Sequence, residues 1–268
     1  MDTGRITLEK HGGIGRLELH APPMNALTRP MVAQLGDLLQ ACRDDAQVRV
    51  LLVHGAGARA FSAGSDLREL RALIARGAPA LDAKFAQDME VFSRLADFPK
   101  PTVAAIEGAA IGGGLELASC CDFVVAALGA RLALPEVRLG VFPSSGGTVH
   151  VTRRIGAARA RRMMLLGDPV DPAVALEWGL VDQTCAAGAA LETAMRLAER
   201  LAAGPARAQH ACKAAIRAAL CGSEADALEL ARRYAVELGL SDDLAEGLRA
   251  FDEKREPNFG EAPPARAR

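Results

Sequence analysis

The sequence predicts an α/β fold with a mixed core and an all-helical C-terminal region. Up to about residue 143, short aliphatic runs alternate with segments of helical periodicity, the pattern of right-handed βαβ units around a parallel sheet. From Leu191 to Lys254 every segment has helical spacing, interrupted by glycine-containing breaks. Half of the 268 residues are hydrophobic, so the chain can bury a sizeable core. We predict a division near residue 200, with an α/β core at 1–200 and a helical region at 201–268.

The predicted strands are short aliphatic and β-branched runs between turn residues. They lie at residues 6–8, 17–19, 48–54, 102–106, 123–125 and 181–185. The first two alternate around the turn Gly12-Gly13, which is typical of a hairpin. The run at 48–54 is expected to be buried on both faces of its sheet. A loop of small residues is expected at 55–66.

Helices are predicted where apolar residues recur every three or four positions or where a capping signal precedes them. Thr28 is the expected N-cap of a helix that ends near Cys42. Helical spacing extends over residues 67–74 and 85–95, and a short helix is expected after the glycines at 112–114. Asp171-Pro172 indicates a further helix start.

Composition and charge limit the partners that the chain can have. The net charge of -1 argues against nucleic acid, because duplex binding depends on an excess of Lys and Arg. Aromatic residues make up only 4%, which leaves few platforms for stacking bases. The basic run from Arg153 to Arg162, on an expected pair of short helices, leaves an RNA-binding module as an unlikely alternative.

No targeting, membrane or metal signal is visible in the sequence. The N-terminal residues lack a basic segment followed by an apolar run, and no stretch reaches ~18 apolar residues. None of the six cysteines forms a C-x-x-C pair, and the adjacent Cys120-Cys121 is expected to be a pair of buried thiols. We expect a soluble, cytoplasmic protein without metal or membrane partner. Residues 261–268 are expected to form a frayed tail.

The richest segment for chemistry is the glycine cluster Gly112-Gly113-Gly114, which follows a strand and opens a helix. Helix starts carry free N–H groups and the positive end of the helix dipole, so such a turn can hold an anion or a charge that develops in a transition state. A tight turn required only by packing is the alternative. The spacing matches neither a phosphate loop nor the dinucleotide motif G-x-G-x-x-G.

Two glutamates in apolar surroundings are candidates for acid–base chemistry. Glu116 follows the glycines and Glu136 follows a proline. Two carboxylates in such settings can hold different protonation states, so that one is an acid and the other a base. The alternatives are a helix-dipole partner for Glu116 and a surface pair of Glu136 with Arg138. The Ser65 N–H is expected to face the same site, although Asp66 could simply cap the next helix.

With these residues in place, the sequence resembles the crotonase family, the enoyl-CoA hydratase/isomerase superfamily, over nearly its whole length. The resemblance implies a spiral core of repeated ββα units, a helical region used for trimerisation, and acyl-CoA substrates. The matching segments are Asn25–Leu27, Phe61–Asp66, Ile111–Glu116, Leu134–Glu136, Gly146–Thr148, Ala175–Val181 and Ala250–Arg255.

The resemblance also implies roles for the candidate residues. The N–H groups of Ser65 and Gly113 would form an oxyanion hole around the thioester carbonyl. In hydration of a 2-enoyl-CoA to a 3-hydroxyacyl-CoA, Glu116 would take a proton from water and Glu136 would protonate the α-carbon. Because dedicated isomerases of the family lack the carboxylate at the position of Glu116, the pair favours a hydratase, a lyase. Double-bond isomerisation and thioester hydrolysis are the alternatives.

Further contacts follow from the resemblance alone. Coenzyme A would be part of the substrate rather than a cofactor, and the chain would form a homotrimer or a hexamer. Residues 70–92 would line the acyl pocket. Substrate contacts are expected at Ala26, Ala63, Gly64, Asp66, Leu67, Arg68, Gly112, Pro135 and Ser144, and CoA contacts at Arg29, Phe251 and Lys254.

Two residues depart from the pattern of typical hydratases. Ser144 stands where these enzymes have a glycine whose backbone helps to hold the nucleophilic water, and Ser65 stands where alanine is common. Ser144, Ser145 and His150 lie close in sequence, but no G-x-S-x-G motif is present, so we set a serine hydrolase aside.

Overall fold

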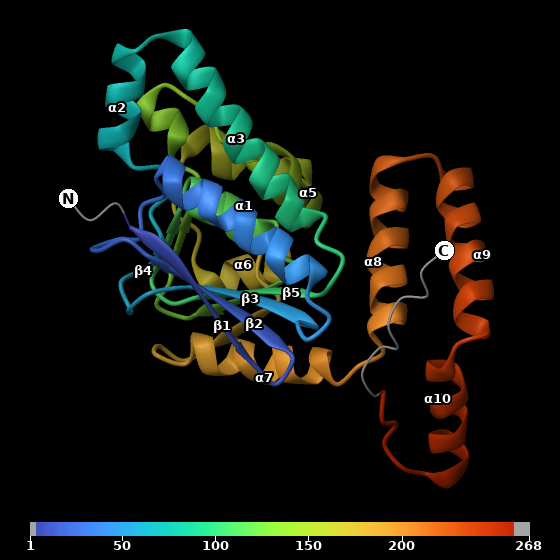
Figure 1. Ribbon diagram of the computed structural model, residues 1–268. Coiled ribbons are helices and arrows are strands. Elements are labelled where there is room, and N and C mark those ends of the chain that lie inside the picture. The colour runs from blue at the N-terminus through green and yellow to red at the C-terminus, as the bar shows by residue number, and fades with distance from the viewer. Residues whose placement is uncertain (1–3, 260–268) are drawn as a thin grey trace.

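A computed structural model describes residues 4–259 and contains two sheets (Figure 1). The larger sheet has six strands, with the first two antiparallel and all others parallel to their neighbours. In spatial order these are β1 (Arg5–His11), β2 (Ile14–His20), β3 (Val50–Gly55), β5 (Thr102–Ile106), β7 (Phe123–Ala127) and β9 (Gln183–Cys185). Every one of them overlaps a strand predicted from the sequence, so these predictions are confirmed.

The smaller sheet has three parallel strands, which the residue pattern did not predict. They are β4 (Ala60–Ser62), β6 (Ala109–Ile111) and β8 (Arg131–Ala133). The expectation of a loop at 55–66 is therefore wrong for its middle part, because three residues are too few to establish an alternating pattern. Strands of the two sheets follow one another along the chain as β3–β4, β5–β6 and β7–β8. This repetition is the spiral of strand pairs and helices that the crotonase resemblance implies.

Helices fill the connections, and most begin and end where sequence signals place them. Asp66 caps α2 (Leu67–Ala75) through bonds from the Arg68 and Glu69 N–H groups, and Asp171 caps α6 (Pro172–Trp178). The helices before residue 140 are α1 (Arg29–Asp44), α2 (Leu67–Ala75), α3 (Ala78–Ala96), α4 (Gly113–Ser119) and the 3₁₀ turn η1 (Glu136–Leu139). Those after it are α5 (Gly147–Leu166), α6 (Pro172–Trp178), α7 (Ala190–Ala202), α8 (Ala206–Cys221), α9 (Glu224–Gly239) and α10 (Asp242–Glu253).

The large sheet is buried on both faces. Val50 and Leu52 of β3 belong to a cluster with the alanines of α7, whereas Leu51 and Val53 pack into the main core with α1. Figure 1 shows α7 on one side of the sheet and α1 and α3 on the other. Burying a valine or leucine side chain contributes roughly 1.5–3 kcal/mol. The two-sided burial therefore fixes the strands of the large sheet, and β3, β5 and β7 lead into the small-sheet strands β4, β6 and β8 that precede the turns with the candidate residues.

The C-terminal helices α8, α9 and α10 stand beside the core in Figure 1, joined to it after α7. They expose large apolar side chains, among them Leu240 at 87% and Phe251 at 82%. The all-helical character predicted for this region is confirmed, while the division into units at residue 200 stays a prediction. The expected tail at 261–268 lies outside the described residues. No helix in the described part of the chain is long and apolar enough to cross a membrane.

Candidate active site

The glycine-rich turn between β6 and α4 packs directly against the turn that follows β4. Gly64 has a φ of 82°, and a β-carbon at this position would lie 2.8 Å from the Gly113 nitrogen. Glycine is therefore needed for the two backbones to approach so closely. The Gly112 N–H donates to the Ala133 carbonyl of β8 at 2.9 Å, which ties the glycine turn to the small sheet.

Two backbone N–H groups at this junction are free to bind an acceptor. Ser65 and Leu27 form an isolated β-bridge, in which the Leu27 N–H donates to the Gly64 carbonyl and the Asp66 N–H donates to the Leu27 carbonyl. Neither bond uses the Ser65 N–H, which has no acceptor within residues 4–259. Gly113 is the first residue of α4, and N–H groups in the first helical turn have no partner inside the helix. These donors could stabilise an oxygen that becomes negatively charged.

Glu116 is buried, and its carboxylate is held by a distant turn. Its Oε1 accepts the N–H groups of Ser145 and Gly147, each at 2.8 Å. Burial raises the pKa of Glu116 to about 7, opposed by these two N–H bonds and reinforced by the negative charges of Glu136 and Asp88. The carboxyl group can therefore exchange a proton near neutral pH.

Glu136 lies at the start of η1 with both carboxylate oxygens buried and without a hydrogen-bond partner in the described part of the chain. Burial raises its pKa as well. The alternative surface pair with Arg138 is not formed, because Arg138 contacts Asp168 and the Leu166 carbonyl instead. A buried carboxyl group without partners costs stability, which is typical of a group retained for chemistry.

The donors and the carboxylates meet around the glycine turn. A β-carbon at Gly113 would lie 3.7 Å from the Ser65 nitrogen and 3.8 Å from Glu116 Oε2. A β-carbon at Gly112 would lie 3.0 Å from Glu136 Oε1. An acyl group at this point could therefore contact N–H donors and both carboxyl groups. Among residues 4–259, no group of three or more His, Cys, Asp or Glu side chains could hold a metal ion.

Sequence reasoning missed the residues that support this arrangement. The residue pattern gave no signal that the N–H groups of Ser145 and Gly147 would bind the Glu116 carboxylate. The helix expected at 85–95 is confirmed by α3, but its buried face differs from the apolar positions, since Met89 is 52% exposed while Lys84 and Asp88 are buried. Charged residues four positions apart on a helix normally indicate a solvated pair, so the sequence held no signal for their burial.

The other expected substrate contacts surround the same two turns. Segment 24–27 runs beside residues 63–66, joined by bonds from the Leu27 N–H to the Gly64 carbonyl and from the Ala63 N–H to the Met24 carbonyl. Ala26 and Ala63 are partly exposed there. The remaining expected contacts lie at the start of α2 (Asp66, Leu67, Arg68), before η1 (Pro135) and before α5 (Ser144).

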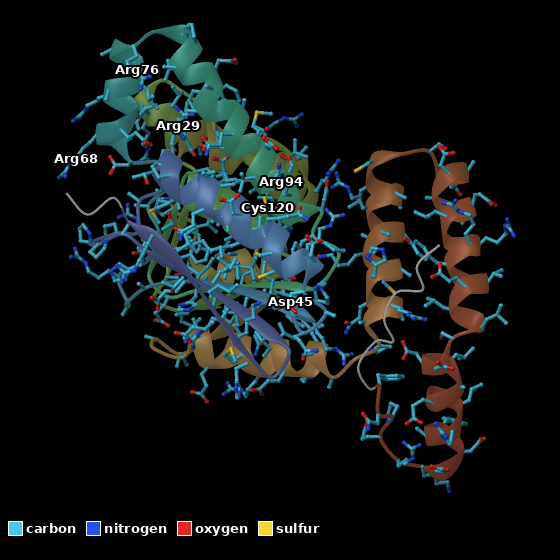
Figure 2. All side chains as sticks on the ribbon, viewed as in Figure 1. Arg29, Asp45, Arg68, Arg76, Arg94 and Cys120 are labelled. Atoms are coloured by element: carbon cyan, nitrogen blue, oxygen red, sulfur yellow. The ribbon has the colours of Figure 1, made fainter. Side chains whose placement is uncertain are left out.

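The expected CoA contacts do not come together in one chain. Arg29 and Arg68 lie around α2 with Arg76, as Figure 2 shows. Arg29 and Arg76 line a cleft of about 450 Å³ between α1, α2 and α3. Phe251 and Lys254 lie at the exposed end of α10, away from this part of the molecule in Figure 1.

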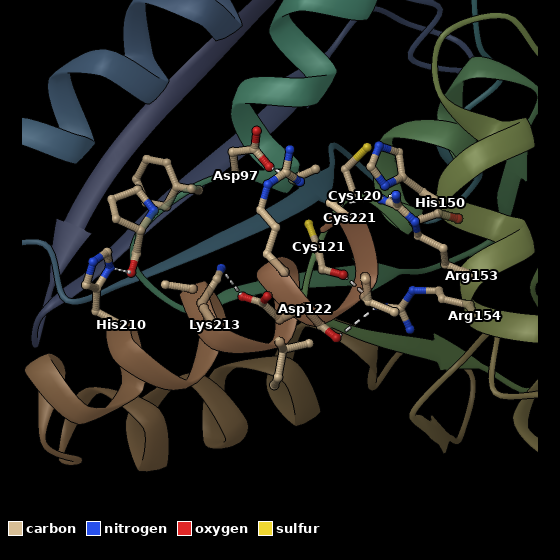
Figure 3. Close-up of a pocket in the computed structure, with 18 residues that line it drawn as sticks. Asp97, Cys120, Cys121, Asp122, His150, Arg153, Arg154, His210, Lys213 and Cys221 are labelled. Atoms are coloured by element: carbon tan, nitrogen blue, oxygen red, sulfur yellow. Dashed lines mark hydrogen bonds and ion pairs between the residues drawn. The ribbon is translucent and has the colours of Figure 1, made fainter. Parts of the chain in front are cut away.

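A second cleft, of about 530 Å³, lies between α8 and the core and contains neither candidate glutamate (Figure 3). Lys213 pairs with Asp122 across it, and Arg154 donates to the Cys121 and Asp122 carbonyls. The basic run thus contributes at least one arginine to internal contacts. It lies on two short helices as expected, because α5 is broken at Gly156, which has a φ of 76°.

In the described part of the chain, no serine–histidine pair forms near this cleft. The Ser145 hydroxyl donates to Asp88 rather than to His150. His150 makes no hydrogen bond to a serine within residues 4–259.

Comparisons with known proteins identify the family of this chain. The family described as "Enoyl-CoA hydratase/isomerase" matches residues 9–262. A Bacillus subtilis protein named "Probable enoyl-CoA hydratase" is 37% identical over 255 residues, covering 95% of this chain and 98% of its own. A Citrobacter koseri "Carnitinyl-CoA dehydratase" is 35% identical, covering 92% and 95%. A solved Bacillus anthracis enoyl-CoA hydratase superposes with a TM-score of 0.91 at 29% identity, covering 96% and 99%. The chain therefore belongs to the enoyl-CoA hydratase/isomerase family and has the crotonase fold.

Proposed function

We propose that the chain is a 2-enoyl-CoA hydratase, which adds water across the 2,3 double bond of an acyl-CoA thioester. The observation that carries this proposal is the pair of glutamates with buried carboxylates, Glu116 and Glu136, beside the free Ser65 N–H. Hydration needs two proton transfers at neighbouring carbons and a site for the negative charge that forms between them. The pair and the free donor meet each of these requirements.

The Ser65 and Gly113 N–H groups are proposed to bind the thioester oxygen. As water adds to C3, electron density moves through C2 onto this oxygen and gives it enolate character. Fixed donors stabilise that charge more strongly than the neutral carbonyl, which lowers the barrier. The close packing at Gly64 keeps the two donor turns at a fixed separation.

The two carboxyl groups then move the protons. Ionised Glu116 takes one proton from water as the water oxygen forms its bond to C3. Protonated Glu136 gives its proton to C2, which collapses the enolate to 3-hydroxyacyl-CoA. A proton returned from Glu116 to Glu136, directly or through solvent, completes the cycle. The bonds to Ser145 and Gly147 favour the ionised form of Glu116, and the partnerless burial of Glu136 favours its protonated form.

A different reaction of the family is the second candidate, either double-bond isomerisation or thioester hydrolysis. Two observations favour keeping it. Ser144 stands in the turn next to the residues that hold Glu116, where its side chain can re-aim a water molecule. One relative is named a carnitinyl-CoA dehydratase, which shows that reactions differ among chains of this similarity. NMR analysis of the products from several acyl-CoA thioesters would separate these reactions.

Coenzyme A is proposed to lie near α2 as part of the substrate, with no separate cofactor. The cleft lined by Arg29 and Arg76 offers two cations for its phosphates, and Arg68 lies nearby. The exposed apolar side chains of α8 to α10 support a homotrimer or a hexamer, in which Phe251 and Lys254 could approach a neighbouring chain. A cytoplasmic location goes with this proposal.

The test is the loss of the enoyl-thioester absorbance of crotonyl-CoA, followed with wild type and Glu136→Gln in parallel. Rapid loss with the wild type alone, with 3-hydroxybutyryl-CoA as the product, would establish hydration and place Glu136 in the chemistry. Absence of loss with both proteins, while butyryl-CoA still binds, would overturn the hydratase proposal in favour of another reaction.

A further inference from the structure

Helix α3 turns two charged side chains toward the core. Its buried residues are Lys84, Asp88, Val91, Phe92 and Leu95. The Lys84 and Asp88 side chains are only 3% and 5% exposed and form an ion pair. Removing two charges from water is costly, and apolar residues of similar size would often give equal or greater stability. The pair therefore calls for an explanation beyond the stability of the helix.

The contacts at the two ends of the pair supply that explanation. Lys84 Nζ donates to Ser65 Oγ at 3.1 Å, in the turn whose backbone N–H is a proposed oxyanion donor. Asp88 Oδ2 accepts the Ser145 hydroxyl at 3.4 Å, and the Ser145 N–H donates to Glu116. One uninterrupted chain of contacts thus runs from Ser65 through α3 to the carboxylate of Glu116.

Along the polypeptide, the path from the Ser65 turn to the Ser145 turn is long. Ser65 and Ser145 are far apart in sequence and belong to turns on different helices, α2 and α5. A fixed distance between these turns matters because a displacement of 1 Å at a reacting centre can reduce the rate by about 100-fold. Both turns are followed by exposed segments, whereas the α3 pair that joins them is buried.

We propose that Lys84 and Asp88 are positioning residues, which hold the Ser65 turn and the Ser145–Gly147 turn in register across the reaction site. This inference rests on the proposed hydratase function. It assigns a role to Ser65 Oγ, since alanine at this position would keep the N–H donor but lose the Lys84 contact. It also assigns the Ser145 side chain to Asp88 rather than to nucleophilic chemistry.

The charge of Asp88 gives the proposal a second, independent consequence. Glu116 is faced by Glu136 from η1 and by Asp88 from α3, with Lys84 behind Asp88, and it is held by N–H groups of the turn before α5. On its own helix the Cys120 thiol donates to the Glu116 carbonyl. Because negative Asp88 raises the pKa of Glu116, removing that charge should lower it.

The decisive variant is the double substitution K84M/D88L, which removes both charges together and leaves neither one buried alone. We expect it to fold, with its melting temperature at or above that of wild type. With crotonyl-CoA its kcat should fall at least tenfold, with KM changed less than threefold. Lys84→Met alone should lower kcat as well, but it leaves Asp88 unpaired, so its folding must be checked first.

Helix α3 also offers a matched control. Arg94 and Glu90 form an ion pair with the same four-residue spacing on the same helix, but their side chains are 49% and 60% exposed. The double substitution R94M/E90L should leave kcat, KM and the pH profile within twofold of wild type. A loss equal to that of K84M/D88L would attribute the effect to α3 in general and would overturn the proposal.

A titration without substrate separates failure of this proposal from failure of the hydratase assignment. The carboxyl carbon of Glu116 would be followed by ¹³C NMR in the ligand-free protein, with Glu116→Gln used to assign the signal. Asp88→Asn should shift the Glu116 titration to lower pH. If the wild type does not hydrate crotonyl-CoA but the titration shifts, the hydratase proposal fails and the α3 link to Glu116 stands. If K84M/D88L keeps wild-type kcat and Asp88→Asn leaves the titration unchanged, the pair is merely structural and the positioning role is refuted.

Discussion

Glu116 and Glu136 are chemically identical and both have their carboxylates buried near the same glycine turn, yet the regions that hold them differ. Glu116 lies within α4, and its Oε1 accepts two N–H groups from the turn at 145–147. Glu136 begins the short turn η1, and neither of its oxygens has a partner in the described structure. One region fixes its carboxylate in place, and the other leaves it free to meet a ligand.

In the proposed mechanism this difference gives two roles to one residue type. Burial raises the pKa of both groups. This effect is opposed at Glu116 by the N–H groups of two distant residues, Gly147 and Ser145, but at Glu136 only by its own backbone N–H. A base that must accept a proton from water benefits from such bonds. An acid that must deliver a proton to carbon benefits from their absence.

The largest expected effect comes from replacing either carboxyl group. Glu116→Gln and Glu136→Gln should each lower kcat for crotonyl-CoA by about 100- to 10,000-fold, the usual contribution of one acid or base. The two variants should differ with butyryl-CoA in D₂O. Glu116→Gln should still exchange an α-proton for deuterium, because Glu136 remains, whereas Glu136→Gln should not.

Proton NMR of the recovered butyryl-CoA measures this exchange. Glu192→Gln, an exposed substitution on α7, is the matched control and should behave as wild type. Equal exchange in both active-site variants would show that the two carboxyl groups are interchangeable, and the contrast between the regions would then be lost.

The second-largest effect is expected from a substitution that fills the space beside the glycine turn, between Ser65 and Glu116. A methyl group at Gly113 would make only ordinary contacts, 3.6 to 3.8 Å from Gly64, Ser65 and Glu116. Gly113→Ala should therefore fold normally but obstruct the place proposed for the thioester oxygen. We expect a loss in kcat/KM on the order of 100-fold, comparable to removing one oxyanion donor.

Gly129→Ala serves as its control, since a β-carbon there would meet nothing within 4 Å. Circular dichroism would verify folding of both variants, and steady-state kinetics would give the rates. Wild-type activity of Gly113→Ala would place the substrate elsewhere.

A smaller effect is expected in the pH dependence of stability. The pKa of Glu116 is about 7 in the folded chain and 4.5 in the reference state. Between these values the unfolded chain releases the proton while the folded chain keeps it, so stability falls as pH rises from about 4.5 to 7. Glu116→Gln avoids this loss and should be more stable than wild type above pH 7, by up to roughly 3 kcal/mol at 1.36 kcal/mol per pH unit.

Chemical denaturation at pH 5 and pH 8 measures that difference, which should be small at the lower pH. Glu136→Gln should change stability in the same direction, because its pKa is raised too. A variant that is less stable than wild type at pH 8 would mean that the two N–H bonds outweigh the burial of the charge.

The smallest effect is expected at Arg138, the residue that could have paired with Glu136 but contacts Asp168 instead. Arg138→Ala breaks an exposed ion pair, which contributes about 0–1 kcal/mol. The rate with crotonyl-CoA should stay within twofold of wild type, and the pH profile should not move. A shift in the acidic or the basic limb of the pH–rate profile would reveal an Arg138–Glu136 interaction during turnover.

The two sheets differ in whether their strands can be predicted from the sequence. All six strands of the large sheet were predicted, because most of their aliphatic runs must be buried by helices or neighbouring strands. The strands at 60–62, 109–111 and 131–133 were not, since three residues are too few to carry a periodic signal. Yet the small sheet places the turns at Gly64 and Gly112 side by side.

By itself, the sequence determined the α/β core, the helical C-terminal region, the glycine turn and the two candidate glutamates, because burial and turn formation depend on local residue types. Only the tertiary structure decided that Glu116 is held by the Ser145 and Gly147 N–H groups, that Glu136 has no partner, and that the Lys84–Asp88 pair is buried. Such contacts join segments distant in the chain. Their energies depend on which groups lose water together, and no local pattern records that.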